Sequence, residues 1–443
     1  MTVRQKDMAP RSRPRKPRKI AKKRYDSTQK IKYSKSIISG GLRVISEEIP
    51  NNESFALGIC VNNGSRDDFE GYEGISHFIE HAVFKRSKNR TGKQIAVRFE
   101  NMGAYFNAFT EKEFTCFYVR ALKKHFRRSL ELLTEVVFSP SFTQTEIENE
   151  KKVIIEEIKS IEDDAEELIF DMADKQLYSG NSMDHPIAGS IDSVKNTTID
   201  KLIEFHHQQY SPRNIVVSLT GSIPHKRALR VIEEFFSDAV RQGIKSTRNE
   251  PIITEPSIRM IEKPYHQDHI LLSARTEGIS SCDRYPLAIF NILFGDGMSS
   301  RLYQKLRERN SLVYAVYSSL LLNSDCGSFH IYAATDPENS RKTEKLIFEE
   351  IKRAISKKIP LTEINRSKEQ LKTGIILELE GLSSRMQNLA KNEFTIGKQE
   401  NIEDTLKEVD AVTQERIMEV IEKYLTKDKW HKTILKADQS ETE

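Results

Sequence analysis

Apolar and polar residues alternate with the period of a β-strand along residues 42–48 and 55–62, and the second stretch ends at the turn Asn63-Gly64. Beyond that turn, apolar residues recur every three or four positions, which is the spacing of helices that bury one face. The pattern predicts helices over residues 74–84, 93–102 and 125–138, paired strands over 105–109 and 114–121, and a further long helix after Thr143.

A similar order of elements recurs after a polar stretch at residues 241–251. Strands are predicted over 258–262, 269–275, 312–322 and 326–333, and helices over 285–294, 300–309 and 338–354. Strands that correspond by their order lie about 215 residues apart, as a diverged duplication would place them. Strands followed by helices in each set indicate the α+β class, with two similar domains that each pack helices on a largely antiparallel sheet.

The predicted organisation is a basic arm at residues 1–36, a first domain at 37–240, a linker at 241–254 and a second domain at 255–443. With 443 residues, the chain is long enough for two or three domains of ordinary size. No run approaches the ~18 apolar residues of a membrane-spanning helix, and the beginning lacks the apolar segment of a secretory signal. We therefore expect a cytoplasmic protein without a transmembrane segment.

The arm is strongly basic. Residues 1–36 hold 14 Lys and Arg against two Asp, a net charge of +12, and the total of +4 leaves −8 for the rest of the chain. With three prolines and few apolar residues the arm cannot bury a core, which predicts a disordered, solvated segment. The alternatives are weak contact with nucleic acid or another polyanion, and an organelle presequence. The acidic remainder argues against nucleic acid as the main ligand.

The positions of the cysteines and of one histidine pair exclude some kinds of metal site. The sequence contains no C-x-x-C pair, so we expect neither a disulfide framework nor a zinc site made of thiolates. We predict buried thiols, in a reducing compartment, for Cys60, Cys116, Cys282 and Cys326. The pair His206-His207 has no metal-ligand spacing to an acidic helix, which predicts a surface position.

The segment His77-Phe78-Ile79-Glu80-His81 lies in a predicted helix and carries the strongest chemical signal. His77 and His81 project from one helix face, and their spacing suits two imidazoles on one Zn²⁺. A catalytic zinc needs a third protein ligand and an open position for water, and a carboxylate beside that water can accept its proton. Glu80 faces the same way and is the candidate base. The alternative is an accidental grouping on a solvated helix face.

Longer motifs around this segment resemble those of the pitrilysin or insulinase family of zinc peptidases, above all its single-chain bacterial members and the catalytic processing peptidases. They are residues 61–67 (VNNGSRD), 74–81 (GISHFIEH) and 103–110 (GAYFNAFT), and the resemblance covers about residues 38–430. It implies one zinc ion per chain. It also implies an active chain, because the glycine-rich loop of the non-catalytic processing-peptidase subunit is absent.

By this resemblance the third zinc ligand is Glu157, 76 positions after His81, in residues 150–157 (EKKVIIEE). Glu150, two helical turns earlier, is implied to take part in catalysis by hydrogen-bonding the ligands rather than the metal. Glu156 points away from them on the helix and is predicted to be a surface carboxylate.

The resemblance also assigns substrate contacts. It places Arg307 and Tyr314 of the second domain on the substrate backbone, with Tyr314 near the developing oxyanion. Such donors act only if the two domains form a clam-like pair that closes on the substrate. The alternative is a structural Arg and a core Tyr. The peptide itself is expected to add as a strand along residues 103–110, where it meets Asn107, Ala108 and Phe109.

Together these implications predict a zinc-dependent endopeptidase for unfolded or short polypeptides, with Glu80 as general base. A homodimer is the expected state, and a heterodimer is the alternative. The rival function is a catalytically silent subunit of a heteromeric complex, against which intact His77, Glu80, His81 and Glu157 argue. A second rival is a nucleic-acid-associated protein that acts through the basic arm.

Overall fold

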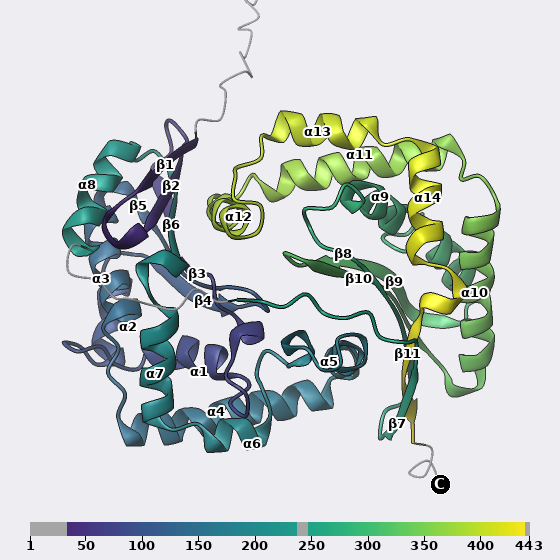
Figure 1. Cartoon of the computed structure of the whole chain (residues 1–443), viewed down its shortest axis with the longest axis horizontal. Helices are drawn as coiled ribbons and strands as arrows, with labels where there is room; N and C mark the ends of the chain where they lie inside the picture. The colour runs from purple at the N-terminus through teal and green to yellow at the C-terminus, as the bar shows by residue number, and fades with distance from the viewer. Residues whose placement is uncertain (1–32, 237–246, 439–443) are drawn as a thin grey trace, which may run out of the picture. The chain divides into compact units, whose positions relative to one another are not determined.

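The computed structural model describes residues 33–236 and 247–438, and Figure 1 shows two β-sheets with helices packed against them. The first sheet has six strands in the order β1-β2-β6-β3-β5-β4. These strands are β1 (Tyr33–Ile37), β2 (Arg43–Glu48), β3 (Ser54–Val61), β4 (Tyr105–Thr110), β5 (Thr115–Leu122) and β6 (Ile215–Gly221). Strand β4 therefore lies at one edge of the sheet.

The second sheet repeats this plan with five strands in the order β7-β11-β8-β10-β9. They are β7 (Ile258–Lys263), β8 (Asp268–Glu277), β9 (Val313–Leu322), β10 (Cys326–Thr335) and β11 (His431–Ala437). Without β1, the two orders correspond strand by strand, and in each sheet a single pair is parallel, β2 with β6 and β7 with β11. The predicted α+β class with two similar domains is confirmed.

Helices pack on each sheet in the two halves. The first half has α1 (Ile75–Val83), α2 (Gly92–Glu100), α3 (Phe126–Phe138), α4 (Gln144–Asp163), α5 (Ala165–Leu177), α6 (Ile191–Asn196), α7 (Ile199–Gln209) and α8 (His225–Phe236). The second has α9 (Arg284–Phe294), α10 (Ser340–Ser356), α11 (Leu361–Glu378), α12 (Leu382–Thr395), α13 (Ile402–Ala411) and α14 (Gln414–Tyr424). Each half buries an apolar core of its own between sheet and helices, and α5 of the first half packs against β8 and β11 of the second sheet.

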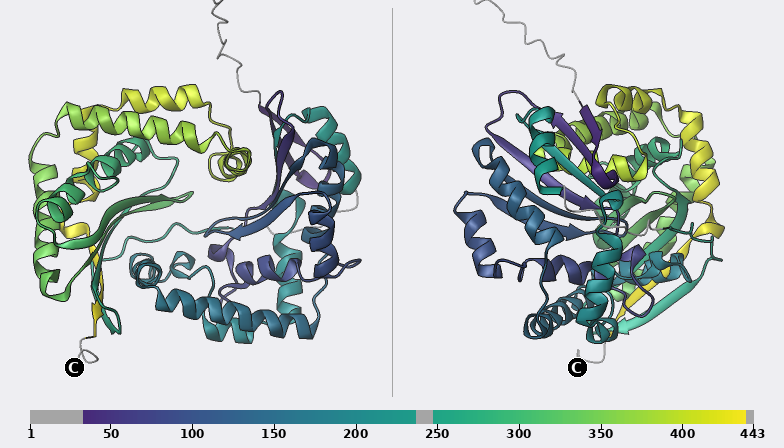
Figure 2. Two further views of the ribbon diagram at one scale, coloured as in Figure 1. Left: turned by 180° about the vertical axis from the view of Figure 1, so that it is seen from behind. Right: turned by 60° about the vertical axis from the view of Figure 1, so that its left-hand side comes forward.

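Helix α12 crosses from the second half of the sequence to the first sheet, as the views of Figures 1 and 2 agree. Its Met386, Leu389 and Ala390 are buried in one apolar cluster with first-sheet residues that include Ile45 and Val216. Ion pairs frame this contact: Glu393 accepts from Lys35 at 2.7 Å, and Arg385 pairs with Glu47. The two halves are thus joined by side-chain packing as well as by the chain itself.

Three predictions of local structure are corrected. Residues 33–36, assigned to the basic arm, belong to β1, whereas residues 1–32 lie outside the described part of the chain. Residues 300–309, predicted as an ordinary helix, contain a π-helix at Tyr303–Glu308. The second predicted helix begins at Gly92 rather than at residue 93, because Thr91 caps it and exchanges hydrogen bonds with Gln94 in a capping box. Of the linker, residues 241–246 are outside the description.

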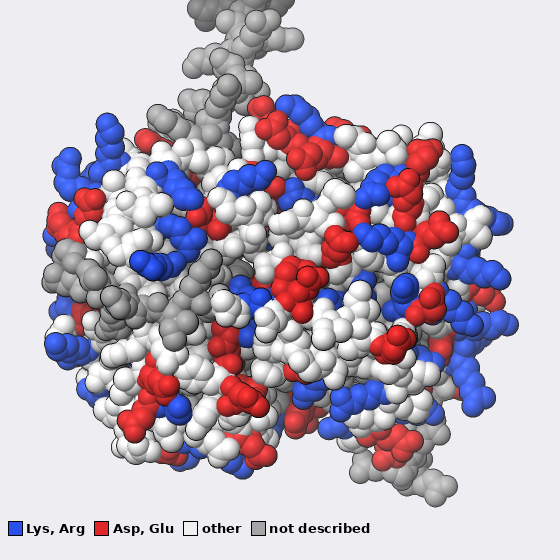
Figure 3. All heavy atoms as spheres, viewed as in Figure 1, with Lys and Arg blue, Asp and Glu red and all other residues white. Residues whose placement is uncertain are grey.

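Hydropathy and surface charge describe the outside of the molecule. No helix in the described ranges is both long and apolar enough to cross a membrane. Over the face shown in Figure 3, acidic and basic side chains are interspersed, and Lys and Arg gather along the edge where Figure 1 places α10.

Candidate metal centre

Helix α1, which carries the His-x-x-Glu-His segment, begins at a fixed point. Its N-cap Gly74 has a left-handed φ of 91°, and a Cβ there would lie 2.4 Å from the carbonyl oxygen of Ala188, so glycine is required. The carboxylate of Asp68 accepts hydrogen bonds from the backbone N–H groups of Gly74 (2.6 Å) and Ser76 (3.1 Å). Asp68 thereby satisfies donors that a helix leaves free at its start and fixes the direction of α1.

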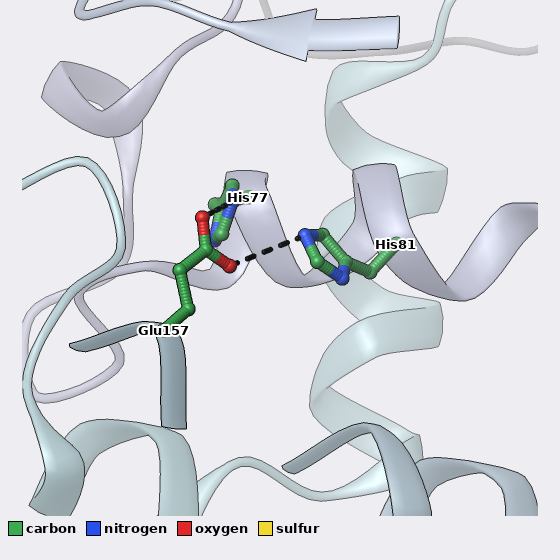
Figure 4. Close-up of side chains that lie close together, drawn as sticks. All are labelled: His77, His81 and Glu157. Atoms are coloured by element: carbon green, nitrogen blue, oxygen red, sulfur yellow. Dashed lines mark ion pairs between the residues drawn. The ribbon is translucent and has the colours of Figure 1, made fainter. Parts of the chain in front are cut away.

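Three side chains converge beside α1 (Figure 4). The Nε2 atoms of His77 and His81 lie 3.6 Å from Oε1 and Oε2 of Glu157, respectively. Glu157 comes from α4, which packs against α1. Within residues 33–236 and 247–438, this is the one group of three or more His, Cys, Asp or Glu side chains close enough to hold a metal ion. The structure therefore brings the three predicted ligands together.

The spacing of these atoms suits zinc better than direct hydrogen bonding. A separation of 3.6 Å exceeds the usual 2.7–3.2 Å of an N–H···O hydrogen bond. Atoms about 2.0–2.2 Å from a tetrahedral zinc lie roughly 3.3–3.6 Å from one another. Burial, assisted by the charge of His81, lowers the pKa of His77 to about 4, so its ring is neutral near pH 7 as a ligand must be. Two imidazoles and a carboxylate fit a catalytic zinc.

His81 is oriented by a second carboxylate, that of Glu150. Its Nδ1 donates to Oε1 of Glu150 at 2.8 Å, which leaves Nε2 directed at Glu157, and Oε2 of Glu150 pairs with Lys85 Nζ at 2.8 Å. Burial alone would raise the pKa of Glu150, but the hydrogen bonds from His81 and Lys85 lower it. Glu150 is therefore an anion, 3% exposed, that fixes the tautomer and the ring plane of His81.

Glu80 lies on the same helix, and its carboxylate has one hydrogen bond of its own. Oε2 accepts from the Thr110 hydroxyl at 2.6 Å. Burial raises the pKa of Glu80, and the hydrogen bond from Thr110 lowers it in part. A half-buried carboxylate with a raised pKa and one fixed partner has the properties of a general base.

Arg307 and Tyr314 lie apart from this group. Arg307 is exposed in the π-helix, with its guanidinium 5.3 Å from the centre of the Tyr303 ring. Tyr314, in β9, is 73% exposed and lines a cleft of about 770 Å³ together with residues 163–167, which follow Glu157 along the chain. Between described residues, no hydrogen bond or ion pair joins either side chain to the three candidate ligands. The alternative of a core Tyr is wrong, since Tyr314 is exposed.

The predicted peptide-binding strand is β4, at the edge of its sheet. Its partner β5 pairs with it antiparallel, from Tyr105 opposite Arg120 to Thr110 opposite Thr115. The backbone N–H of Ala108 donates to the Asn107 side chain at 2.9 Å. An edge strand normally presents such donors unpaired, and here the strand's own amide side chain covers one of them.

Sequence reasoning missed the residues that support this site. Asp68, Lys85 and Thr110 are separated from their partners by 8, 65 and 30 positions, so no local pattern links them. Glu156 is exposed, as predicted. The surface position expected for His206 is wrong, because this side chain is 2% exposed and its Nε2 donates to the carbonyl oxygen of Val137 at 2.7 Å.

The cysteines follow the prediction in part. All four are free, and Cys60, Cys116 and Cys326 are buried, but Cys282 is exposed. Cys60 and Cys116 lie opposite one another on β3 and β5.

Comparison with known proteins matches both halves to one family. Residues 43–190 match the profile "Insulinase (Peptidase family M16)" and residues 196–371 match "Peptidase M16 inactive domain". An uncharacterized zinc protease of Mycobacterium leprae is 33% identical over 89% of this chain and 89% of its own length. A second, of Bacillus subtilis, is 32% identical over 88% of this chain and 94% of its length.

The fold has solved counterparts as well. A protease from Helicobacter pylori superposes with a TM-score of 0.85, at 21% identity, over 92% of this chain and 100% of the other. The name "inactive domain" for the second match agrees with the absence of a metal-binding group from the described residues of the second half. The chain therefore belongs to the insulinase family of peptidases, M16, as its sequence motifs indicated.

Proposed function

We propose that this chain is a zinc-dependent endopeptidase that binds one zinc ion through His77, His81 and Glu157 and uses Glu80 as the general base. The observation that carries the proposal is the convergence of the Nε2 atoms of the two histidines on the Glu157 carboxylate. The half-buried carboxylate of Glu80 lies on the same helix as the two histidines. The names of the relatives, which are zinc proteases, support it.

Each side chain has a distinct task in this proposal. Bound zinc supplies Lewis acidity, which makes water more acidic and polarises a peptide carbonyl. Glu80 accepts the proton of the attacking water and delivers it to the leaving amine. Thr110 holds the Glu80 carboxylate in one rotamer. Glu150 accepts a hydrogen bond from the protonated Nδ1 of His81, and this tautomer leaves Nε2 of His81 free of a proton.

The second half completes the proposed site. Arg307 and Tyr314 contact the substrate backbone, and the Tyr314 hydroxyl donates to the oxygen that gains charge as the peptide carbonyl is attacked. The exposure of Tyr314 supports this role, because its hydroxyl is available to a ligand. Its cleft, shared with residues 163–167, continues from the helix that carries Glu157.

The substrate adds as a strand to the free edge of β4 in this proposal, where it meets Asn107, Ala108 and Phe109. The Ala108 N–H bonds only a side chain, so the sheet does not need it. Ala108→Pro removes that donor without breaking the pairing with β5, and KM should rise about tenfold or more while zinc content stays constant. Unchanged kinetics in the folded, zinc-loaded variant would show that the peptide binds elsewhere.

We further propose a homodimer located in the cytoplasm, with unfolded or short polypeptides as substrates. The rival function, a silent subunit that pairs with another chain, shares the fold and predicts bound metal without turnover. Activity decides between these two functions.

The deciding experiment measures metal and turnover in the same preparation. Purified protein should contain about one zinc per chain, cleave a mixed peptide library, lose activity to a chelator and regain it with zinc. Glu80→Gln should retain the metal and lose about 10²-fold or more in kcat, because the shape is kept and the base is gone. Full metal content with no cleavage of any peptide by the parent chain would favour the silent subunit.

A further inference from the structure

Charged side chains from both halves meet in one buried cluster, which we call the Arg66 clamp: Arg66, Asp67, Glu113 and Arg248 around the turn formed by Ser324 and Asp325. The turn connects β9 to β10. Arg66 holds Asp325 with two parallel hydrogen bonds, Nη1 to Oδ1 and Nη2 to Oδ2, each 2.7 Å. Bidentate pairs between guanidinium and carboxylate are among the strongest and most directional contacts in proteins.

Glu113 holds the same turn from the other side. Its Oε2 accepts from the backbone N–H of Ser324 (2.8 Å) and its Oε1 from the Ser324 hydroxyl (2.6 Å). Glu113 also pairs with Arg66 at 2.7 Å. The side chains of Arg66 and Glu113 are 0% and 8% exposed, so water screens these charges little. Glu113 thus binds the turn through both the backbone and the side chain of Ser324.

The segment that connects the halves is tied into the clamp as well. Arg248 donates to both oxygens of Asp67, at 3.0 and 2.7 Å, and to the carbonyl oxygen of Glu113 at 2.5 Å. Arg66 donates to the carbonyl oxygen of Asn249 at 2.6 Å. The clamp therefore fixes four parts of the chain at one point: the loop after β3, the β4–β5 hairpin that carries Glu113, the connecting segment and the β9–β10 turn.

The loop after β3 also anchors the candidate metal helix. Asp68, next to Asp67, holds the first N–H groups of α1, and the Ser76 hydroxyl donates to Asp68 and to the carbonyl oxygen of Gly64. A Cβ on Gly64 would lie 2.2 Å from the carbonyl oxygen of Glu111, so this loop packs tightly on the hairpin of β4 and β5. The position of the clamp is thus rigidly related to α1.

Strand β9 connects the clamp to Tyr314. Tyr314 stands near the start of β9 and Asp325 follows its end, so roughly 30 Å of extended chain separates them. Strand β9 pairs with β10 along its length, so the hairpin is rigid and a rotation at the turn displaces its other end. A tilt of about 5° at the clamp moves the far end by roughly 2–3 Å, and misplacement by ~1 Å can lower a reaction rate about 10²-fold.

From this arrangement we propose that Arg66 and Asp325 are positioning residues, which set the place of Tyr314 relative to the metal helix by fixing the angle between the two halves. The role of Tyr314 rests on the proposed function, whereas the fixed angle does not. Two further joints connect the halves: α12 packs on the first sheet through apolar contacts and the ion pairs of Glu393 and Arg385, and α5 packs on the second sheet. The clamp adds to these joints a bidentate guanidinium–carboxylate pair, whose geometry constrains direction as well as distance.

Asp325→Asn tests the proposal directly. The amide keeps the shape of the carboxylate but points an N–H donor at the guanidinium, so the bidentate pair is lost. Asp283→Asn is the matched control, because Asp283 is a buried carboxylate whose partners, Arg416, Lys423 and Tyr424, all lie in the second half. Both variants lose a carboxylate that binds cations, and only the first loosens the joint.

The angle is read without reference to activity. Spin labels at Lys152→Cys on α4 and Lys352→Cys on α10, with the exposed Cys282 replaced by Ser, report the distance between the halves. Asp325→Asn should broaden or shift this distance distribution, and Ser324→Ala, which keeps every charge, should do so to a smaller extent. Asp283→Asn should leave it unchanged. Distributions that stay unchanged in both clamp variants, or that change equally in Asp283→Asn, would overturn the proposal.

Turnover supplies the second reading. Asp325→Asn should lower kcat about tenfold or more, with a smaller change in KM and the same zinc content, while Asp283→Asn keeps the parent kcat. A shifted distance with an unchanged kcat would overturn the link to Tyr314. If the parent chain cleaves no peptide, the proposed function fails, and the distance measurement still decides whether the clamp sets the angle.

Discussion

The two halves share a strand order but differ in the side chains of one helix, which follows β3 in the first half and β8 in the second. In the first half that helix is α1, with His77, Glu80 and His81 on one face. In the second half it is α9, whose buried residues, Leu287 and Phe290 among them, are all apolar or proline. The topology provides a place for a helix beside the sheet in both halves. That place becomes a candidate metal centre only in the first half, among the described residues, where the histidines of α1 meet Glu157 of α4.

The comparison also shows how the halves divide the work. The first holds all three candidate ligands and the proposed base, and the second holds exposed groups such as Tyr314 to which we assign substrate contacts. A duplicated fold can lose its metal site in one copy because the sheet and its core do not depend on the metal.

The largest expected contrast is between histidines of the two halves. His81→Ala removes a ligand and should cost the zinc and about 10³-fold or more in turnover, because several kcal/mol of charge stabilisation disappear with the metal. His330→Asn is the counterpart: His330 is buried in β10 and bonds the hydroxyls of Ser273 and Ser328. It should lower thermal stability and leave the zinc in place. Metal analysis and thermal unfolding check both, and stoichiometric zinc in His81→Ala would contradict the ligand assignment.

A smaller contrast separates two tyrosines on β9. Tyr314→Phe should lower kcat by about 10- to 10²-fold, with less effect on KM, because it removes a donor that acts in the transition state. Tyr317→Phe removes a hydroxyl that donates at 2.7 Å to Glu166 of α5, a contact between the halves, and should lower kcat less than Tyr314→Phe does. Steady-state kinetics of the two zinc-loaded variants measure this. Equal losses in both would show that β9 acts through its packing and not through the Tyr314 hydroxyl.

The smallest expected effect is on pH dependence. Burial raises the pKa of Glu80 and the Thr110 hydroxyl lowers it, and the base works only when deprotonated. Activity should therefore be present above the pKa of Glu80 and fall as the pH decreases through it. Thr110→Val removes the lowering contribution, so the acid limb of kcat/KM should move to higher pH, while Thr335→Val in β10 should not move it. Zinc content measured at each pH separates this effect from loss of metal, and an acid limb that moves down would refute the role of Thr110.

Local periodicity predicted what depends on neighbours in sequence. The four-residue spacing of His77 and His81 was enough to place both rings on one helix face. Glu157 was different: its carboxylate reaches the ligands from another helix, 76 positions on, and resemblance rather than spacing identified it. The fold class followed from the order of strands and helices, which is itself a local signal.

Long-range contacts could not be predicted in this way. The adjacent pair His206-His207 resembled a surface pair, yet the fold buries His206 against a carbonyl oxygen of α3. Arg66 and Asp325 are 259 positions apart, and nothing in either neighbourhood identifies the partner. Strand β1 is short and half polar, so its pattern could not be told from that of the arm, and only pairing with β2 defines it.

The crossing of α12 onto the first sheet has a consequence for synthesis. The strands that α12 covers end with β6 at residue 221, whereas α12 itself ends at residue 395. At roughly 5–20 residues per second, a ribosome needs about 10–35 seconds to add the intervening chain. Until then the nascent first half presents the apolar surface of Ile45, Ala56 and Val216 without its cover. The nascent chain therefore exposes this apolar surface after the half with the candidate metal centre has been synthesised, and a chaperone that covers the surface in that interval would limit aggregation.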